Sequence, residues 1–288
     1  MYNGGCGNVK MRHVIIPANY YQNFNADYLL EFPAEGYGGW KKTGLKFDLD
    51  ELAVVVMHAW DCSSYGKYPG WYRVAEWLPR AKRICQMYLP ELLTTVRDRN
   101  IRLFHVASDE SYCHMLPGYK RTLELMAQEH AVCSNSISNS FSAKRLEPSS
   151  ILEDLNNFRM KNCSYGLHNR QDIEDGFENL DFAPEAKPLD SEEIAVSSDQ
   201  LVTLCRTYGI NHLVYTGFNI NWCLHTSPCG MVDMNRNGFM CSTIRQAVTA
   251  VENKETARHE ICKEIALWRV ALEYGFVFNI DDFIASVK

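Results

Sequence analysis

A continuous run of six apolar residues, Leu52-Ala53-Val54-Val55-Val56-Met57, is the feature that most restricts the fold of this chain. An unbroken apolar run of this length suits a strand that is buried on both faces, as in parallel sheets covered by helices. Further apolar segments at residues 101–107, 213–216 and 277–278 alternate with segments of helical spacing. This alternation predicts a three-layer α/β/α sandwich around a central, mostly parallel sheet.

The segments between these strands predict helices with recognisable ends. A helical pattern runs from 71 to 99 and is divided by Pro90, which removes a helical hydrogen bond. Gly209 and Gly275 follow two further helical patterns at positions where glycine commonly ends a helix. The other expected elements are helices at 119–129, 201–208 and 255–274, and a short strand at 239–243.

Two segments fall outside the alternation. Residues 1–46 are rich in Tyr, Asn and Gly, and we expect an irregular N-terminal extension that lies over the domain. The domain itself is expected to span residues 47–288. Residues 132–190 interrupt it with a Ser/Asn-rich stretch, a helical piece at 151–160 and an acidic stretch. We interpret them as a long insertion that serves as a lid or as an oligomer contact.

Composition excludes several classes of function. The chain has 288 residues and a net charge of −6, without a basic cluster of the kind that binds nucleic acid. No apolar run reaches the length that crosses a bilayer, and the N-terminus lacks the pattern of a signal peptide. The 11 cysteines include no C-x-x-C pair, so we expect no metal, no cofactor and a reducing, cytoplasmic environment.

A strand, a glycine and a cysteine follow one another in the run from Tyr215 to His225. The apolar strand ends near Gly217, and Cys223 stands six residues later, where a helix is expected to begin. Unsatisfied N–H groups at such a position stabilise a thiolate, the nucleophilic form of cysteine. The alternative is a buried structural thiol, which is the usual role of a scattered free cysteine.

Polar residues follow two other predicted strands. His58 and Asp61 come after the first strand, and Ser108 and Asp109 come after the second. In open parallel sheets, ligands collect at the carboxyl ends of the strands. A His and a Cys brought together at this edge can act as general base and nucleophile. The alternatives are that His58 bonds to the backbone at the strand end and that Asp61 caps a turn.

The sequence resembles the isochorismatase-like cysteine hydrolases, a superfamily that includes nicotinamidases and N-carbamoyl amide hydrolases. Two segments carry the resemblance: Val54-Val55-Val56-Met57-His58-Ala59-Trp60-Asp61 and Gly217-Phe218-Asn219-Ile220-Asn221-Trp222-Cys223. It implies that Cys223 attacks an amide carbonyl to give a thioester. It also implies a cis peptide at Phe218–Asn219 and an oxyanion hole formed by the N–H groups of Asn219 and Cys223. The superfamily further implies a homo-oligomer.

The chain departs from the family at the two other members of the Asp-Lys-Cys triad. His58 stands at the position of the aspartate, and residues 192–197 offer no lysine, with Lys187 several residues too early. Two interpretations follow. Either His58 replaces the aspartate as the base, with Asp61 orienting it, or the triad is dismantled and the protein serves in binding or assembly.

Three aromatic residues are candidates for the substrate pocket, namely Trp60, Phe218 and Trp222, although core packing is an alternative for Trp60. The first interpretation predicts a cysteine hydrolase that cleaves a C–N bond of a small amide, carbamoyl or ureido compound. The substrate itself is not specified by these residues, because loops and the insertion shape the pocket.

Overall fold

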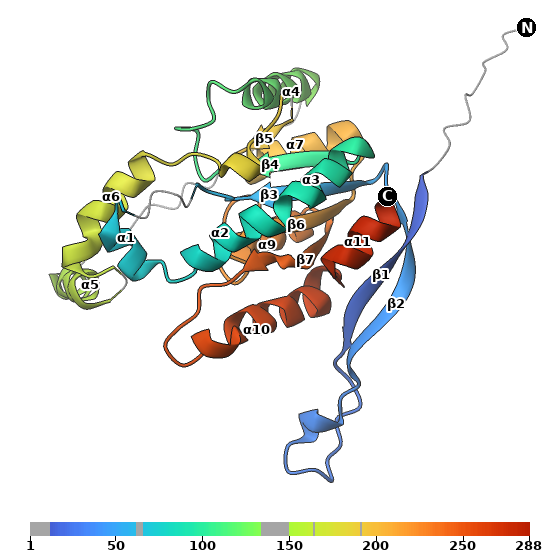
Figure 1. Ribbon diagram of the computed structural model, residues 1–288, viewed down its shortest axis with the longest axis horizontal. Coiled ribbons are helices and arrows are strands. Elements are labelled where there is room, and N and C mark those ends of the chain that lie inside the picture. Colours follow the sequence, from blue (N-terminus) through green and yellow to red (C-terminus); the bar gives the residue numbers. More distant parts are fainter. Residues whose placement is uncertain (1–11, 62–65, 134–149, 164, 191) are drawn as a thin grey trace, which may run out of the picture.

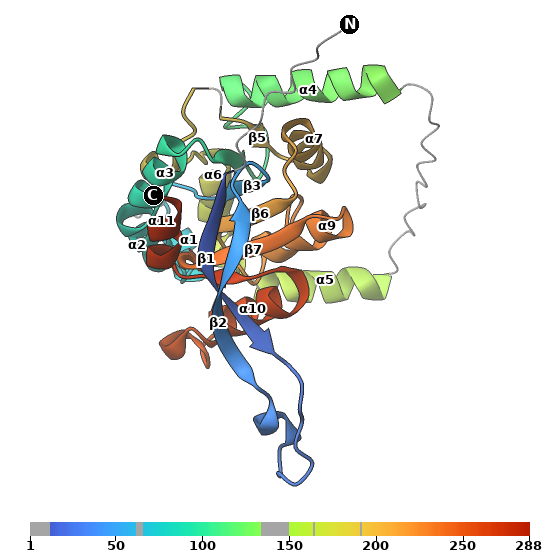
Figure 2. The same ribbon diagram turned by 90° about the vertical axis from the view of Figure 1, so that its right-hand side faces the viewer.

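The described part of the chain forms one sheet with helices on both faces (Figures 1 and 2). The computed structural model describes residues 12–61, 66–133, 150–163, 165–190 and 192–288. Within these residues, eight strands form a single sheet in the order β2-β1-β8-β7-β6-β3-β4-β5. The predicted three-layer α/β/α sandwich is confirmed.

Six of the eight strands are parallel to one another, as the apolar runs predict. The central strand β3 pairs with β4 on one side and with β6 on the other. The six parallel strands are β3 (Leu52–Met57), β4 (Arg102–Val106), β5 (Ile194–Ala195), β6 (His212–Phe218), β7 (Met240–Thr249) and β8 (Val277–Phe278). Strand β7 is longer than the expected 239–243.

The side chains of β3 enter two separate hydrophobic clusters. Val54 and Val56 belong to one cluster and Val55 and Met57 to the other, and all four are almost fully buried. Successive side chains of a strand point to opposite faces, so a strand between two helical layers must be apolar throughout. The first layer contains α2 (Leu78–Met87), α3 (Leu89–Asp98) and α11 (Ile280–Val287). The second contains α7 (Ser198–Tyr208), α9 (Met231–Arg236) and α10 (Ile261–Arg269).

Prolines divide the helical pattern between β3 and β4 into three helices. Helix α1 (Pro69–Val74) precedes α2 and α3, and each of the three has a proline in its first two positions. Proline is tolerated there because its missing N–H would have no partner within the helix. The expected division at Pro90 is therefore confirmed, and Pro79 starts a further helix.

The C-terminal cap of α7 agrees with the sequence. Gly209 adopts a left-handed conformation with φ +69°, and the Ser197 side chain caps the other end by accepting from the Gln200 N–H. The expected helix at 255–274 instead begins at Ile261, after a short 3₁₀ turn, η4 (Ala257–His259). It continues as a π-helical turn, η5 (Val270–Tyr274), before Gly275.

The expectation of an irregular segment at 1–46 is wrong for the residues that the structure describes. Strands β1 (His13–Gln22) and β2 (Gly39–Asp48) form a long antiparallel hairpin, which joins the sheet where β1 pairs with β8. The connection at 23–38 contains a 3₁₀ turn, η1 (Pro33–Gly36), rather than a two-residue hairpin turn. This long connection removes the short-range signal by which hairpins are recognised.

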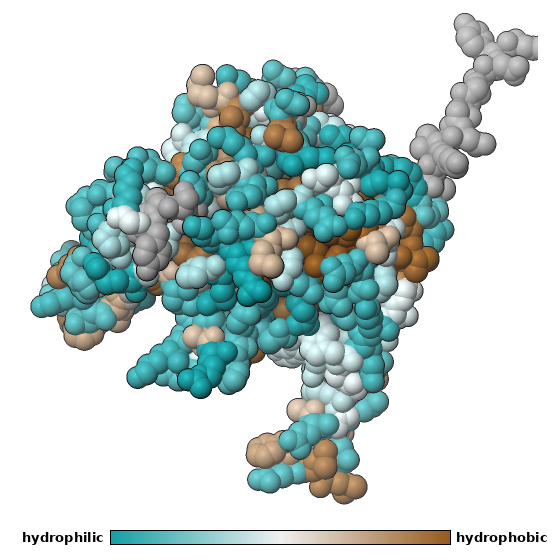
Figure 3. Space-filling view, viewed as in Figure 1, coloured by the Kyte–Doolittle hydropathy of each residue, from teal (hydrophilic) through white to brown (hydrophobic). Residues whose placement is uncertain are grey.

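The hairpin projects from the body of the molecule (Figure 1), and apolar residues gather at its tip (Figure 3). Tyr28, Leu29 and Phe32 are among the exposed apolar residues of this tip. Among the described residues, no helix is both long and apolar enough to cross a membrane.

The predicted insertion contains mainly helices where the structure describes it. Helix α4 (Pro117–Cys133) packs against α7 and runs into the start of this segment. The expected helical piece is confirmed as α5 (Ser150–Asn162). Next come two 3₁₀ turns, η2 (Leu167–Asn169) and η3 (Pro184–Ala186), with α6 (Arg170–Glu178) between them. The Ser/Asn-rich stretch lies largely outside the described residues, and the lid or oligomer role stays a prediction.

Candidate active site

Strands β3 and β6 end side by side and carry the residues that were expected to react. Gly217 of β6 pairs with Met57, the last residue of β3, and has a φ of +110°. A Cβ atom at position 217 would lie 1.9 Å from the Met57 carbonyl oxygen, so this approach requires glycine. The approach places His58 and the segment that leads to Cys223 at the same edge of the sheet.

The segment after β6 has the backbone that the resemblance implies. The Phe218–Asn219 peptide bond is cis, as expected. Helix α8 (Cys223–Thr226) begins at the cysteine and is a single turn. The backbone N–H groups of Asn219 and Cys223 donate no hydrogen bond to any group in the described residues. Two donors of this segment are thus without a partner among the described residues.

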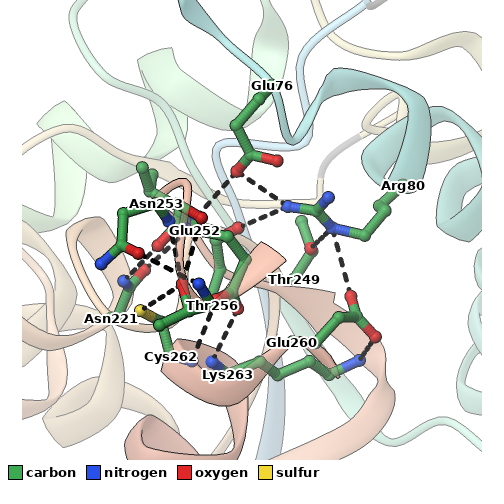
Figure 4. Close-up of polar contacts among 12 residues, drawn as sticks. Glu76, Arg80, Asn221, Thr249, Glu252, Asn253, Thr256, Glu260, Cys262 and Lys263 are labelled. Atoms are coloured by element: carbon green, nitrogen blue, oxygen red, sulfur yellow. Dashed lines mark hydrogen bonds and ion pairs between the residues drawn. The ribbon is translucent and has the colours of Figure 1, made fainter. Parts of the chain in front are cut away.

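An amide side chain holds this segment in place. Asn221 Nδ2 donates to the Val251 carbonyl at 2.8 Å, and the Val251 N–H donates back to Asn221 Oδ1 at 2.9 Å. The next N–H along the chain, that of Glu252, donates to Glu76, which also accepts from the Arg80 guanidinium (Figure 4). The segment from Gly217 to Cys223 is therefore tied, through the residues that follow β7, to the start of α2.

The same network fixes where α10 begins. The Glu252 carboxylate accepts from the backbone N–H groups of Cys262 and Lys263, each at 3.0 Å (Figure 4). These donors belong to the first turn of α10 and have no partner within the helix. Burial acts to raise the pKa of the Glu252 carboxyl, but hydrogen bonds from the Thr256 side chain and from these two N–H groups lower it. This cap explains the start of the helix at Ile261 rather than near 255.

His58 is buried directly after β3 in a left-handed conformation with φ +51°. Its ring stacks on Trp60, with ring centroids 5.3 Å apart and planes 12° apart. Burial lowers the pKa of His58 to about 4, although the charge of Asp109 and the backbone of Ala107 act to raise it. The imidazole is therefore neutral at pH 7 and free to accept a proton.

Two buried polar atoms at the site have no hydrogen-bond partner among the described residues. They are His58 Nδ1 and Asn219 Oδ1. Buried polar atoms are almost always paired, because an unpaired one costs free energy. Both atoms belong to residues that line the cavity described next, and each has an unused capacity for a hydrogen bond.

His58, Asn219 and Cys223 line one cavity of about 450 Å³. Cys223 is partly exposed, so its sulfur is not sealed inside the core. Ser108, which follows β4, and Val196, which follows β5, line the cavity as well. Of the residues expected at the carboxyl ends of the strands, His58, Ser108 and Cys223 thus line one cavity, whereas Asp61 and Asp109 do not.

Of the four other predicted site residues, two line the cavity and two do not. Trp60 and Trp222 line the cavity, with Trp60 8% and Trp222 58% exposed. Phe218 does not line it, because its side chain is fully buried against Trp77 in the core. Asp61 does not line it either; its N–H donates to the Asp181 carbonyl, and the groups that shift the pKa of His58 do not include it. The ring of Trp60, rather than Asp61, contacts His58.

No lysine occupies the position that the family triad implies. Val196 stands after β5 and contributes an apolar side chain to the cavity. Lys187 lies outside the cavity, is about half exposed and forms an ion pair with Asp181 at 3.4 Å. The described residues also contain no group of three or more His, Cys, Asp or Glu side chains that could hold a metal ion.

Several cavity residues are not predicted from the sequence. Trp71 and Trp77 lie on the segment between β3 and α2, and Tyr165 and Phe177 come from the insertion. Three tryptophans within residues 60–77 are a signal that the sequence does offer. Phe177 has no such signal, because it reaches the cavity only when α6 packs on α1.

Solved structures with a similar fold are known, but the sequence comparisons find no match. No family model matches the chain, and no curated protein matches it. Its fold is similar to that of a cysteine hydrolase from Pseudomonas syringae pv. phaseolicola, with a TM-score of 0.45 and 12% identity over 84% of this chain and 94% of that one.

Two further solved structures are similar. An isochorismatase-like hydrolase from Alkaliphilus metalliredigens has a TM-score of 0.43 and 16% identity over 83% of this chain and 99% of that one. N-carbamoylsarcosine amidase from Thermoplasma acidophilum has a TM-score of 0.38 and 12% identity over 80% and 97%. At such scores and identities the likeness concerns the layout of the fold, and the chemistry of this site rests on its own residues.

Proposed function

We propose that this protein is a cysteine hydrolase that cleaves a C–N bond of a small amide, carbamoyl or ureido compound. One observation carries the proposal: Cys223, a neutral His58 and Asn219 line the same cavity, and the backbone N–H groups of Asn219 and Cys223 have no partner among the described residues. A nucleophile, a base and an oxyanion hole are the parts that acyl transfer requires.

The proposed reaction has two steps. Cys223 Sγ attacks the carbonyl carbon while its proton passes to His58, and the N–H groups of Asn219 and Cys223 bind the oxyanion. The C–N bond then breaks, the leaving nitrogen takes the proton from His58, and a thioester remains. A water molecule, deprotonated by His58, attacks the thioester, and the proton returns to the sulfur as the acid leaves.

Two groups favour His58 as the base in place of the family aspartate. Burial disfavours the imidazolium that forms during the reaction, and the charge of Asp109 and the backbone of Ala107, which act to raise the pKa of His58, offset part of this effect. Because burial keeps the resting ring neutral, it is in the form that accepts a proton at pH 7.

Turnover by Cys223 variants tests the proposal. Purified protein is incubated with a panel of primary amides and N-carbamoyl compounds, and released ammonia is measured. We expect native protein and Cys163→Ala, which changes an exposed thiol on the insertion, to turn over the same compounds. We expect Cys223→Ala to lose at least about 1,000-fold in kcat while keeping the native circular dichroism spectrum. Full activity of Cys223→Ala would contradict the proposal.

The alternative function is a binding or assembly protein that has kept the fold and lost the triad. The observation that favours it is the apolar Val196 beside the cavity where the family has lysine. The same assay separates the two functions, because a binding protein releases no ammonia from any member of the panel.

A further inference from the structure

A row of aromatic rings forms one wall of the cavity, from His58 to Trp71. The His58 ring stacks on Trp60, and Trp60 meets Phe177 edge to face, with ring centroids 5.8 Å apart and planes 81° apart. Phe177 in turn stacks on Trp71, with centroids 5.3 Å apart and planes 19° apart. All four residues line the cavity. The wall therefore leads from the reaction centre to α1 and α6.

The far end of this wall is built by close packing of α6 on α1. A Cβ atom at Gly176 would lie 2.0 Å from the Trp71 ring, so the helices meet where no larger residue fits. The N–H of Gly70, in the first turn of α1, donates to the Asp172 carboxylate on α6. These contacts hold Phe177 and Trp71 face to face.

The described lining of the cavity carries no Asp, Glu, Lys or Arg side chain. A charged substrate group would lose its hydration here without gaining an ion pair, which costs several kcal/mol. His58, the one titratable nitrogen base among the lining residues, is neutral at pH 7. The lining therefore favours a neutral substrate.

Asn219, close to Cys223 in the sequence, supplies a polar group with which the cavity can recognise a substrate. The unpartnered Oδ1 of Asn219 is an acceptor and matches an N–H of a primary amide or ureido group. The volume of about 450 Å³ is about three times that of a cavity that holds benzene, roughly 150 Å³. A fused two-ring group and an amide fit within it.

We infer that the substrate is a neutral amide or ureido compound whose acyl part carries a planar aromatic group of about two fused rings. The aromatic group packs along the wall from His58 to Trp71, and the scissile N–H bonds to Asn219 Oδ1. The inference rests on the proposed function, since it names the substrate class of the same site. A quaternary ammonium compound is the competing occupant of an aromatic site, and here it would lack any lining carboxylate.

Selectivity of turnover is the first test. Ammonia release is measured for 2-naphthylacetamide, acetamide, the anionic succinamate and the cationic amide of trimethylglycine. We expect kcat/KM for the naphthyl compound to exceed that of each of the others by at least about 100-fold, because burying two rings removes a large apolar area from water. Preference for succinamate, for the cationic amide or for acetamide would overturn the inference while leaving hydrolysis in place.

A variant of the wall adds a structural control. Phe177→Leu keeps an apolar side chain and removes the ring that links Trp60 to Trp71. We expect the naphthyl-to-acetamide ratio of kcat/KM to fall about tenfold. Phe158→Leu, at an exposed position of α5, is the matched control and should keep the native ratio. An unchanged ratio in Phe177→Leu would overturn the inference.

Binding without chemistry separates this inference from the proposed function. Cys223→Ala protein is titrated with the same four compounds while tryptophan fluorescence is recorded, because four of the lining residues are tryptophans. Saturable binding of 2-naphthylacetamide at least about 100-fold tighter than that of the other three supports the substrate class even if no turnover is found. Tighter binding of the cationic amide, or equal binding of all four, contradicts it.

Discussion

The imidazole of His58 lies flat against the indole of Trp60, with centroids 5.3 Å apart and planes 12° apart. From the sequence we expected Asp61 to orient His58, the proposed base. In the structure the ring that stacks on His58 is that of Trp60. Both rings border the cavity that Cys223 borders. We therefore propose that Trp60 positions His58, in addition to forming part of the aromatic wall of the cavity.

Removing the indole should weaken catalysis through His58. We expect Trp60→Leu to lower kcat with a small amide by about two- to tenfold, because an aromatic pair contributes about 0.5–1.5 kcal/mol beyond its buried area. Trp60→Phe retains a ring and should recover most of the loss. The His58 resonances in an NMR titration report the orientation independently of turnover, and identical spectra in native protein and Trp60→Leu would contradict the positioning role.

His58 should stay neutral through the physiological range. Its pKa of about 4 predicts that its ring resonances remain constant from pH 8 to pH 5 and titrate only below this range. The change is followed by NMR, with His58→Gln used to assign the signals. A midpoint near 6.5 would show that burial does not control this residue, and His58 would then be charged in mildly acidic solution.

Acid should destabilise the fold through three buried histidines. Burial lowers the pKa of His58, His212 and His225 to about 4 each, below the 6.5 of an unfolded chain. Between pH 6.5 and 4 the unfolded state binds more protons, so stability is lost as the pH falls. Each histidine should lower the free energy of unfolding by about 2 kcal/mol between pH 7 and pH 5.

Urea unfolding at several pH values measures this dependence, and a variant of His212 isolates one contribution. The His212 ring bonds to Ser242 Oγ at 2.7 Å in the core, away from the cavity. We expect His212→Gln to be less stable at pH 7 but to lose less free energy of unfolding on acidification. The same loss in native protein and variant would contradict the assignment.

The two hydrogen bonds between the Asn221 side chain and the Val251 backbone should stabilise the segment from Gly217 to Cys223. Asn221→Ala removes both hydrogen bonds to Val251, which should lower the free energy of unfolding by about 1–3 kcal/mol and slow modification of Cys223. Asn237→Ala is the control, because it removes one exposed hydrogen bond to the Asp233 carbonyl. Equal effects of the two substitutions would show that these two hydrogen bonds do not stabilise the segment.

Gly217 should tolerate no side chain. Gly217→Ala places a methyl group 1.9 Å from the Met57 carbonyl oxygen, and we expect a loss of at least about 3 kcal/mol. Gly209→Ala is the matched control, since Gly209 also has positive φ but has open space around it. It should cost about 1 kcal/mol. Thermal unfolding compares the two variants, and similar melting temperatures would contradict the close approach.

The fold and the residues that line the Cys223 end of the cavity could be predicted because their signals are local. The apolar run of β3 predicts burial on both faces, and the spacing from Gly217 to Cys223 predicts the segment at the cavity. Both expectations depend on neighbouring residues in the chain. The convergence of His58 and Cys223 followed from the rule for parallel strands.

The remaining features depend on contacts between distant segments. Phe177 lines the cavity because Gly176 allows α6 to meet Trp71 on α1, over a hundred positions earlier. The hairpin of β1 and β2 was missed because its connection at 23–38 hides the pairing. No pattern within either segment specifies its partner, so these features required the structure.

The reactivity of Cys223 at pH 6 tests the central claim most directly. Native protein is treated briefly with iodoacetamide, and the modification of each cysteine is measured by peptide mass spectrometry in native protein and in His58→Gln. Because neutral His58 can accept the thiol proton as the sulfur attacks, we predict that Cys223 is modified at least about tenfold faster than the exposed Cys163, and that this advantage is lost in His58→Gln. Modification of Cys223 no faster than of Cys163, or unchanged by His58→Gln, would contradict a nucleophile activated by His58.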